Sequence, residues 1–425
     1  MKHKTVVIVA ILMLITSSAL WSQRDYTPIS RLGHGMVTLL DGRVMLFGGE
    51  GIEGNLFNDL HAFEESGWNQ VTPANAPPPA RRDHSAWVQD VMYIYGGQGE
   101  TGLLDDIWSF NPATEAWTQL PSGGTSTPIA RKNASMVGYG DDLYVYGGTD
   151  ATGLNLMDFW SYNRTSSNWT QKEGHAPSAG QSAALHNNDM YVYGGIRWNP
   201  DNYRDDVRRY SLPNDNEFHY VYNAGANPGA RAYQAGTYYV DKFWVYGGMN
   251  ANKGILGDFY EFDMSTEIWT QLPDCPVARA YSAMAYVEDD SKIILFGGLD
   301  PYGNATNDLC IYDLSTNTWV LVSIDDEHNP NTQPLLSKNY PNPFNLSTEI
   351  MFSITENTEN VELVIYNLKG QKVKTLVNRT IQSGEHSVSW NGEDESGNPV
   401  GSGLYFYKLK LNDKTEAVKK CVLMK

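Results

Sequence analysis

The sequence predicts an all-β protein that consists of a six-bladed β-propeller followed by a small β-sandwich. An apolar run that ends in two glycines occurs six times, and the steps between the second glycines are 48, 51, 47, 53 and 50 residues. A fixed period near 50 residues is the signature of a repeat architecture. Residues 338–425 show period-two alternation between turn clusters, which predicts an antiparallel sandwich of about seven strands. Helix signals are nearly absent beyond the first twenty residues.

Residues 1–22 predict a signal peptide. Lys2 and Lys4 precede an apolar core from Val6 to Ile15, and small residues follow at 16–19. This core has ten residues, whereas a helix that spans a membrane needs about 20. An uncleaved amino-terminal anchor is the alternative. We therefore expect an exported protein.

Residues 23–323 hold six repeats, and each repeat predicts four short strands. The repeats are 31–80, 81–130, 131–177, 178–230, 231–278 and 279–323. An arginine precedes strand one, two glycines end strand two, an aspartate precedes strand three and a tryptophan lies on strand four. The fourth repeat has Ser178 and Phe218 in place of the arginine and the tryptophan.

The repeated residues have physical roles. The arginines are Arg31, Arg81, Arg131, Arg231 and Arg279; the tryptophans are Trp68, Trp117, Trp169, Trp269 and Trp319; the aspartates are Asp59, Asp106, Asp158, Asp206, Asp258 and Asp308. The glycine pairs are Gly48–Gly49, Gly96–Gly97, Gly147–Gly148, Gly194–Gly195, Gly247–Gly248 and Gly297–Gly298. Paired glycines permit positive φ and close backbone approach. Large aromatic side chains fill the gaps between sheets, so six sheets in a radial array cover one another.

This pattern resembles the Kelch-repeat family over about 290 of the 425 residues. The resemblance implies a six-bladed Kelch-type β-propeller in which strand one of each blade lines a central channel. No strand swap between the first and last blades is evident from the sequence.

Residues 324–337 are polar, contain two prolines and predict a linker. The module at 338–425 opens with Tyr340-Pro341-Asn342-Pro343-Phe344-Asn345, continues through Trp390-Asn391-Gly392 and ends with Lys419-Lys420-Cys421-Val422-Leu423-Met424-Lys425. It resembles the type A carboxy-terminal sorting domain of type IX secretion substrates and the related hook-capping Ig-like domain. The resemblance implies an outer-membrane translocon of a Gram-negative bacterium as a partner and an extracellular or surface location. A purely structural Ig-like module is the alternative.

The arginines before strand one are the first candidate ligand-binding residues. Five guanidinium groups at one opening of the channel would form a positive collar for a carboxylate, a sulfate or an acidic sugar. The alternative is that they only tie the blades together. Two further candidates, Arg197 and Trp198, lie in a long loop of the fourth repeat and suit a sugar ring or a protein partner. Trp198 packing over its own blade is the alternative.

Three residues after the arginine position, His34 and His84 occur in adjacent repeats and are candidate channel ligands. Two histidines are too few for a catalytic metal site, so we expect no metal and no cofactor. Asp83, Tyr233 and Tyr281 are expected to form channel wall. The three cysteines, Cys275, Cys310 and Cys421, form no metal-binding spacing, and a Cys275–Cys310 bridge stays open.

Charge and motifs narrow the function. The net charge of −18 argues against a general role in nucleic-acid binding. The sequence favours a monomeric, non-catalytic binding module for a glycan or a protein at the cell surface. The alternative is a sugar-processing enzyme, such as a sialic acid mutarotase or epimerase-like propeller, and a third hypothesis is a structural surface-layer role. The Cys, Tyr and His set of copper radical oxidases is not recognisable.

Overall fold

The computed structural model describes residues 27–424 with several gaps. The gaps are 65–66, 199–201, 213–217, 223, 289–290, 323–335, 337–338, 340, 343, 355–357, 368–369, 383 and 412–413. The predicted signal peptide and most of the predicted linker lie outside the described residues. The chain divides into two compact units, Met1–Ile324 and Asp325–Lys425. The described part is built from strands and contains no helix that could cross a membrane.

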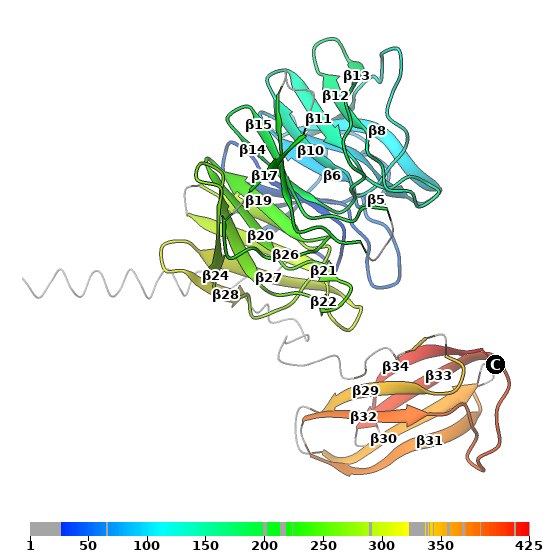
Figure 1. The fold of residues 1–425 in the computed structure, drawn as a ribbon. Helices are drawn as coiled ribbons and strands as arrows, with labels where there is room; N and C mark the ends of the chain where they lie inside the picture. Colours follow the sequence, from blue (N-terminus) through cyan, green and yellow to red (C-terminus); the bar gives the residue numbers. More distant parts are fainter. Residues whose placement is uncertain are drawn as a thin grey trace, which may run out of the picture. The chain divides into compact units, whose positions relative to one another are not determined.

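The first unit contains six sheets, or blades, each made from one continuous segment of the chain (Figure 1). Their strands pair antiparallel, except that the short β18 in the fifth sheet pairs in parallel. The strands of blades one to three are β1 (Gly35–Thr38), β2 (Val44–Phe47), β3 (Leu60–Glu64) and β4 (Gly67–Val71); β6 (Ser85–Val88), β7 (Met92–Gly99), β8 (Gly102–Asn111) and β9 (Ala116–Gln119), with β5 (Arg81–Arg82) added beside β7; and β10 (Ser135–Tyr139), β11 (Asp142–Tyr146), β12 (Phe159–Asn163) and β13 (Asn168–Lys172).

The strands of blades four to six follow the same order. They are β14 (Ser182–His186), β15 (Asp189–Tyr193), β16 (Val207–Ser211) and β17 (Phe218–Val221); β19 (Ala235–Tyr239), β20 (Lys242–Tyr246), β23 (Phe259–Asp263) and β24 (Ile268–Leu272), with β18 (Ala224–Gly225) beside β24 and a separate ribbon of β21 (Met249–Asn250) and β22 (Gly254–Ile255); and β25 (Ala283–Val287), β26 (Lys292–Leu299), β27 (Ala305–Asp313) and β28 (Thr318–Val322).

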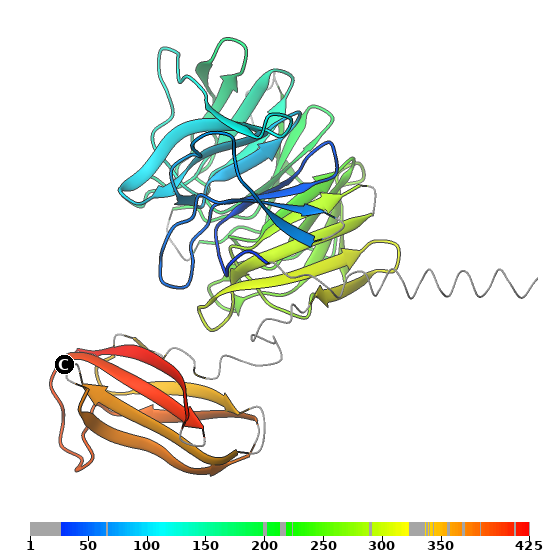
Figure 2. The same ribbon diagram turned by 180° about the vertical axis from the view of Figure 1, so that it is seen from behind.

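The blades close into a ring. Each inner strand contacts the inner strand of the next blade, in the order β1, β6, β10, β14, β19 and β25, and β25 contacts β1. Figure 2 shows the first blade, in blue, beside the last blade, in yellow. The prediction of an all-β, six-bladed propeller is confirmed.

Two circular sets of backbone hydrogen bonds hold the ring together. In the first set, one residue of each blade donates its N–H to the carbonyl of its counterpart in the preceding blade, over 2.7 to 2.9 Å. We call these six residues the mouth ring: Gly33, Asp83, Asn133, Gly180, Tyr233 and Tyr281. All six have positive φ. The circuit closes when Gly33 donates to Tyr281.

The second circular set explains the glycine pairs. Gly148 donates its N–H to the carbonyl of Ser178 in the next blade at 2.8 Å, and the other five second glycines donate in the same way, ending with Gly298 to Arg31. Gly147 has φ +65, and a Cβ on it would lie 2.2 Å from the Ser178 carbonyl oxygen. Only glycine allows this approach, as the sequence predicted. Each described blade is self-contained, so ring closure uses these bonds and no exchanged strand.

Aromatic side chains fill the spaces between blades. Trp117 of blade two packs against Phe110 of its own blade and Phe47 of blade one, with ring centroids 5.2 and 4.9 Å apart. The tryptophans of blades one, three, five and six make the same pair of contacts, and four of the five tryptophans are fully buried. The predicted role of these residues is confirmed.

The second unit is a sandwich of two antiparallel sheets (Figure 1). One sheet pairs β29 (Thr348–Ile354) with β32 (Gly384–Trp390), and the other has the order β31 (Lys372–Ile381), β30 (Thr358–Asn367), β33 (Gly403–Leu411) and β34 (Lys414–Leu423). Buried Trp390 packs against Tyr405 and Phe344 in the core. Leu336, which falls within the predicted linker, is also buried in this core.

Candidate functional site

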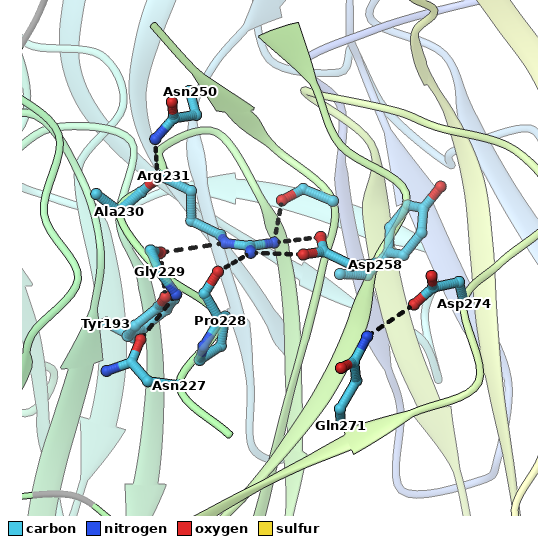
Figure 3. A network of polar contacts seen from close by, with 12 residues as sticks. Tyr193, Asn227, Pro228, Gly229, Ala230, Arg231, Asn250, Asp258, Gln271 and Asp274 are labelled. Carbon is cyan, nitrogen blue, oxygen red and sulfur yellow. Dashed lines mark hydrogen bonds and ion pairs between the residues drawn. The ribbon is translucent and has the colours of Figure 1, made fainter. Parts of the chain in front are cut away.

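In five of the six repeats, the arginine before strand one is buried in an ion pair within its own blade. In blade five, Arg231 Nη1 and Nη2 donate to the two carboxylate oxygens of Asp258 at 2.6 and 2.8 Å (Figure 3). Nη1 also donates to the Gly247 carbonyl at 3.0 Å, and the guanidinium contacts the Pro228 and Gly229 carbonyls. The Arg231 side chain thereby links three segments of its blade: the chain before β19, the glycine pair after β20 and the aspartate before β23.

Arg31, Arg81 and Arg131 repeat this geometry. Arg279 differs, because it donates to only one oxygen of Asp308 and otherwise to Thr306 Oγ1 and the Ala278 carbonyl. The pairs are Arg31–Asp59, Arg81–Asp106, Arg131–Asp158 and Arg279–Asp308. The five arginines are between 0% and 8% exposed. The expected positive collar is therefore wrong, because each guanidinium is turned into its blade and neutralised by an aspartate of the same repeat, in a bidentate pair for all but Arg279. These arginines are structural.

The ion pairs also lower the pKa values of the aspartates. Burial alone would raise the pKa of Asp59, but hydrogen bonds from Arg31 and His61, together with their charges, hold this pKa well below its usual range. The pKa of Asp106 is lowered by Arg81 and Trp108 against the same effect of burial. Both carboxylates are therefore charged throughout the neutral range.

Blade four replaces the missing arginine with one from another strand. Arg208 on β16 is fully buried and donates to the Gly194 carbonyl at 2.9 Å and to Ser178 Oγ at 3.3 Å. Its Nε lies 3.8 Å from Asp206, which pairs more closely with Arg204. Burial lowers the pKa of Arg208, as expected for a guanidinium without a bidentate carboxylate. Sequence reasoning missed Arg208, although the sequence contains a signal for it. Among the six repeats, only the fourth has an arginine two positions after its aspartate, and the fourth is also the repeat that lacks the arginine before strand one.

This substitution predicts a rescue. Arg208→Ala is expected to lower the free energy of unfolding by about 1.5–3 kcal/mol, the usual contribution of hydrogen bonds to a charged group. Adding Ser178→Arg should restore part of that loss, because arginines at this position serve the other five blades. Ser178→Arg alone should destabilise, since two guanidinium groups would then compete for Gly194. Urea unfolding of the four proteins tests this, and independent, additive effects would contradict it.

One end of the channel holds a cavity of about 140 Å³, which we call the mouth cavity. Its wall has two layers. The outer layer is the mouth ring, and the inner layer is formed by the residues that follow it: His34, His84, Ala134, Gln181, Gln234 and Ser282. Asp83, Tyr233 and Tyr281 thus form channel wall, as predicted. At the other end of the channel, Trp87 Nε1 of blade two donates a hydrogen bond to the Tyr238 hydroxyl of blade five at 3.1 Å.

The two predicted histidines line the mouth cavity but pack into the gaps between blades. His34 lies edge-on against Phe296, and His84 lies edge-on against Phe47, with centroids 5.7 and 5.6 Å apart. Burial, followed by the charge of Arg81, lowers the pKa of His84 to about 3. Burial, followed by the charge of Arg31, lowers the pKa of His34 well below 6.5. Within the described residues, no group of three or more His, Cys, Asp or Glu is arranged to hold a metal.

The His84 pKa predicts a pH-dependent stability. The unfolded chain protonates this ring near pH 6.5 and the folded protein only near pH 3, so stability is unaffected above pH 6.5 and falls as the pH decreases from 6.5 toward 3. His84→Gln should remove up to about 1.4 kcal/mol per pH unit of this slope. Glutamine suits the position, because Gln181 and Gln234 occupy it in blades four and five. Urea unfolding at pH 8, 6, 5 and 4 measures the slope. An unchanged slope, or a large loss at pH 8, would contradict the assignment.

The loops that follow the glycine pairs surround the mouth cavity. Each loop begins with a residue that is bridged to the residue just before the mouth ring, for example Ile196 with Ala179. Five exposed apolar side chains lie in these loops: Ile52, Leu154, Met157, Trp198 and Tyr302.

Blades three and four contribute three of these side chains from loops that are tied together. Asn155 donates to the Ile196 and Arg197 carbonyls at 3.3 and 2.8 Å, immediately before Trp198. Trp198 is 60% exposed, so it does not pack over its own blade. We call Leu154, Met157 and Trp198, the three exposed apolar side chains on these two joined loops, the loop patch.

The cysteines are buried and unbridged in the described structure. Cys275 and Cys310 lie in one apolar cluster between blades five and six. A hydrogen bond between them lowers the pKa of Cys275 and raises that of Cys310. The disulfide that the sequence left open is absent here.

Comparisons with known proteins agree with this architecture. The family described as the KLHDC2/KLHL20/DRC7 Kelch-repeats domain matches residues 3–195 and 126–275, the Kelch motif matches 280–324 and the FlgD Ig-like domain matches 343–415.

Three relatives illustrate the similarity. The leucine-zipper-like transcriptional regulator 1 homolog of Drosophila melanogaster is 23% identical over 252 residues, covering 55% of this chain and 25% of that protein. Human host cell factor 2 is 24% identical over 315 residues, covering 63% and 38%. Human Kelch domain-containing protein 3 is 28% identical over 193 residues, covering 41% and 50%. The chain thus spans half or less of the length of each of these relatives.

Proposed function

The chain belongs to the Kelch-repeat family, and from this premise we propose that its propeller is a non-catalytic module that binds a protein through the loops around the mouth cavity. Similarity to Kelch-repeat proteins such as host cell factor 2 and Kelch domain-containing protein 3 suggests a protein-binding propeller. The observation that carries the proposal is the loop patch, because tryptophan and methionine are enriched at protein interfaces and loops on a rigid scaffold commonly carry binding residues.

The geometry gives the enzymatic alternative less support. The sugar-processing hypothesis needed the arginines to hold a substrate carboxylate, and all five are buried in ion pairs with aspartates. The glycan hypothesis keeps only Trp198 and Arg197, and the same experiment tests it.

The experiment probes a peptide display library and a glycan array with the full-length chain. We expect peptide binding that Trp198→Ala weakens by about 10- to 100-fold, as for a hot-spot tryptophan. The control is Leu40→Ala, which changes an 85% exposed leucine in the hairpin between β1 and β2, at the opposite end of the blades. Binding to glycans alone, turnover of a glycan, or equal loss in both variants would overturn the proposal.

We further propose that the second unit directs export by a type IX translocon, so that the propeller acts at the cell surface or outside it. The apolar run at 6–15 and the motifs at 340–345 and 390–392 support this, and the match to the FlgD Ig-like domain agrees with the fold of such a module. Deletion of 338–425 in a host with this system should retain the propeller in the periplasm. A truncated protein that still reaches the surface or the medium would refute the assignment.

A further inference from the structure

The mouth cavity has several buried hydrogen-bond acceptors without a partner. Gln181 Nε2 donates to the Tyr146 carbonyl at 3.0 Å, and Gln234 Nε2 donates to the Tyr193 carbonyl at 3.0 Å. A carbonyl oxygen only accepts, so these bonds fix the orientation of both amides. The Oε1 atoms of both glutamines are therefore turned away from those carbonyls. Both are buried and have no hydrogen-bond partner among the described residues.

Asp83 adds a charge to this set of acceptors. Its side chain lies over Gly33, with Oδ1 2.5 Å from the place where a Cβ on Gly33 would be. Asp83 is 8% exposed, and Oδ1 has no hydrogen-bond partner in the described part of the chain. Oδ2 lies 3.7 Å from Arg82 Nε, which is closer to Glu50, at 2.7 Å. Burial raises the pKa of Asp83, although the charges of Arg82 and Lys132 act in the opposite direction.

Aromatic rings from blades five and six complete the wall. The rings of Tyr233 and Tyr281 stack with centroids 4.3 Å apart and an interplanar angle of 19°. In the mouth ring, Gly33 separates Tyr281 from Asp83 and leaves that position without a side chain. The face of an aromatic ring is electron-rich and attracts cations. His34 and His84 add no positive charge near neutral pH, because burial lowers both pKa values.

We propose that the mouth cavity binds an organic cation, an alkylammonium or guanidinium group such as the end of a lysine or arginine side chain. Asp83 Oδ1 is the counter-ion, the amide oxygens of Gln181 and Gln234 accept hydrogen bonds, and the tyrosine pair flanks the charge. This inference rests on the proposed function, since it names the side-chain type that a protein partner inserts. The cavity of about 140 Å³ has room for roughly four to five waters, enough for such a head group. A net charge of −18 favours the approach of a cation.

The test measures binding to the full-length chain by calorimetry and by NMR titration. The probes are Nα-acetyl-lysine methylamide and Nα-acetyl-arginine methylamide, with the uncharged norleucine analogue and calcium chloride as comparisons. We expect saturable binding of at least one cationic probe and none of the uncharged analogue.

Asp83→Asn should weaken this binding at least tenfold. We expect this variant to fold, because an asparagine already occupies the same ring position in blade three: Asn133 has φ 58, and Asp83 has φ 57. Asp90→Asn, which removes the same charge from a 68% exposed side chain in the hairpin between β6 and β7, at the end of blade two away from the mouth cavity, should leave binding unchanged.

Three results would overturn the inference. They are equal binding of the norleucine analogue, binding of calcium alone that depends on Asp83, and a cavity that binds none of the probes. The outcome is separable from that of the proposed function. Partner peptides that depend on Trp198 but not on Asp83 would leave the proposed function standing and end this inference, whereas probe binding without any partner peptide would do the reverse.

Discussion

Arg81→Ala is expected to destabilise the propeller by about 3–5 kcal/mol, the usual loss when one partner of a buried ion pair is removed. Arg81 is fully buried and donates to both oxygens of Asp106 at 2.6 and 2.8 Å. Without it, the Asp106 carboxylate and the Gly96 carbonyl lose the guanidinium that both contact. The structural role of the arginines therefore predicts a loss of stability, with any loss of binding as its consequence.

The matched control is Arg43→Ala. Arg43 pairs with Asp41 at 2.8 Å, but the two side chains are 25% and 48% exposed, so we expect a loss of no more than about 1 kcal/mol. Guanidinium chloride unfolding followed by tryptophan fluorescence measures both variants in the intact chain. Of the 12 tryptophans, only Trp21 and Trp390 lie outside 23–323, so the signal reports on the propeller. Equal losses in the two variants would contradict the buried-pair assignment.

Gly147→Ala is expected to cost about 2–5 kcal/mol. A left-handed backbone conformation costs an alanine about 1–2 kcal/mol, and overpacking adds about 1–3 kcal/mol. The new Cβ would lie 2.2 Å from the Ser178 carbonyl oxygen, which accepts the interblade bond from Gly148. Relief of this contact requires the two blades to separate.

Gly153→Ala isolates the backbone contribution. Gly153 has φ +88 and nothing within 4 Å of a Cβ, so only the conformational cost applies. The difference between the two variants, measured by the same unfolding experiment, is the effect of close blade contact. If Gly153→Ala proves as harmful as Gly147→Ala, the glycine pair serves backbone conformation alone.

The repeat pattern was sufficient to predict the blades, because its residues act locally and in the same way six times. Trp117 fills the gap beside Phe47, and the glycine pairs allow adjacent blades to approach, as their chemistry implies. The role of the arginines could not be decided in this way. A charged residue at a repeat position has the same appearance whether it faces a channel or an aspartate 25 to 29 residues away, as in the pairs from Arg81–Asp106 to Arg279–Asp308.

The mouth cavity was predictable only in part: Asp83, Tyr233 and Tyr281 were expected to form channel wall, but the six-residue ring to which they belong was not foreseen. The mouth ring contains two glycines, two tyrosines, an aspartate and an asparagine, so no residue type marks the position. What these residues share is a positive φ and a hydrogen bond to the preceding blade, and both properties belong to the folded backbone. The unpartnered oxygens of Asp83, Gln181 and Gln234 are likewise visible only once the side chains are placed.

The closed circuit of hydrogen bonds in the mouth ring has no preferred starting blade. Every blade is built from one continuous segment, so the junction between blades six and one has the same interblade hydrogen bonds as the other junctions, although the chain is not continuous there. A circularly permuted gene could therefore begin at any blade boundary. The linker that joins the old ends must span the path from an outer strand to the next inner strand, which residues 72–84 already cover between β4 and β6.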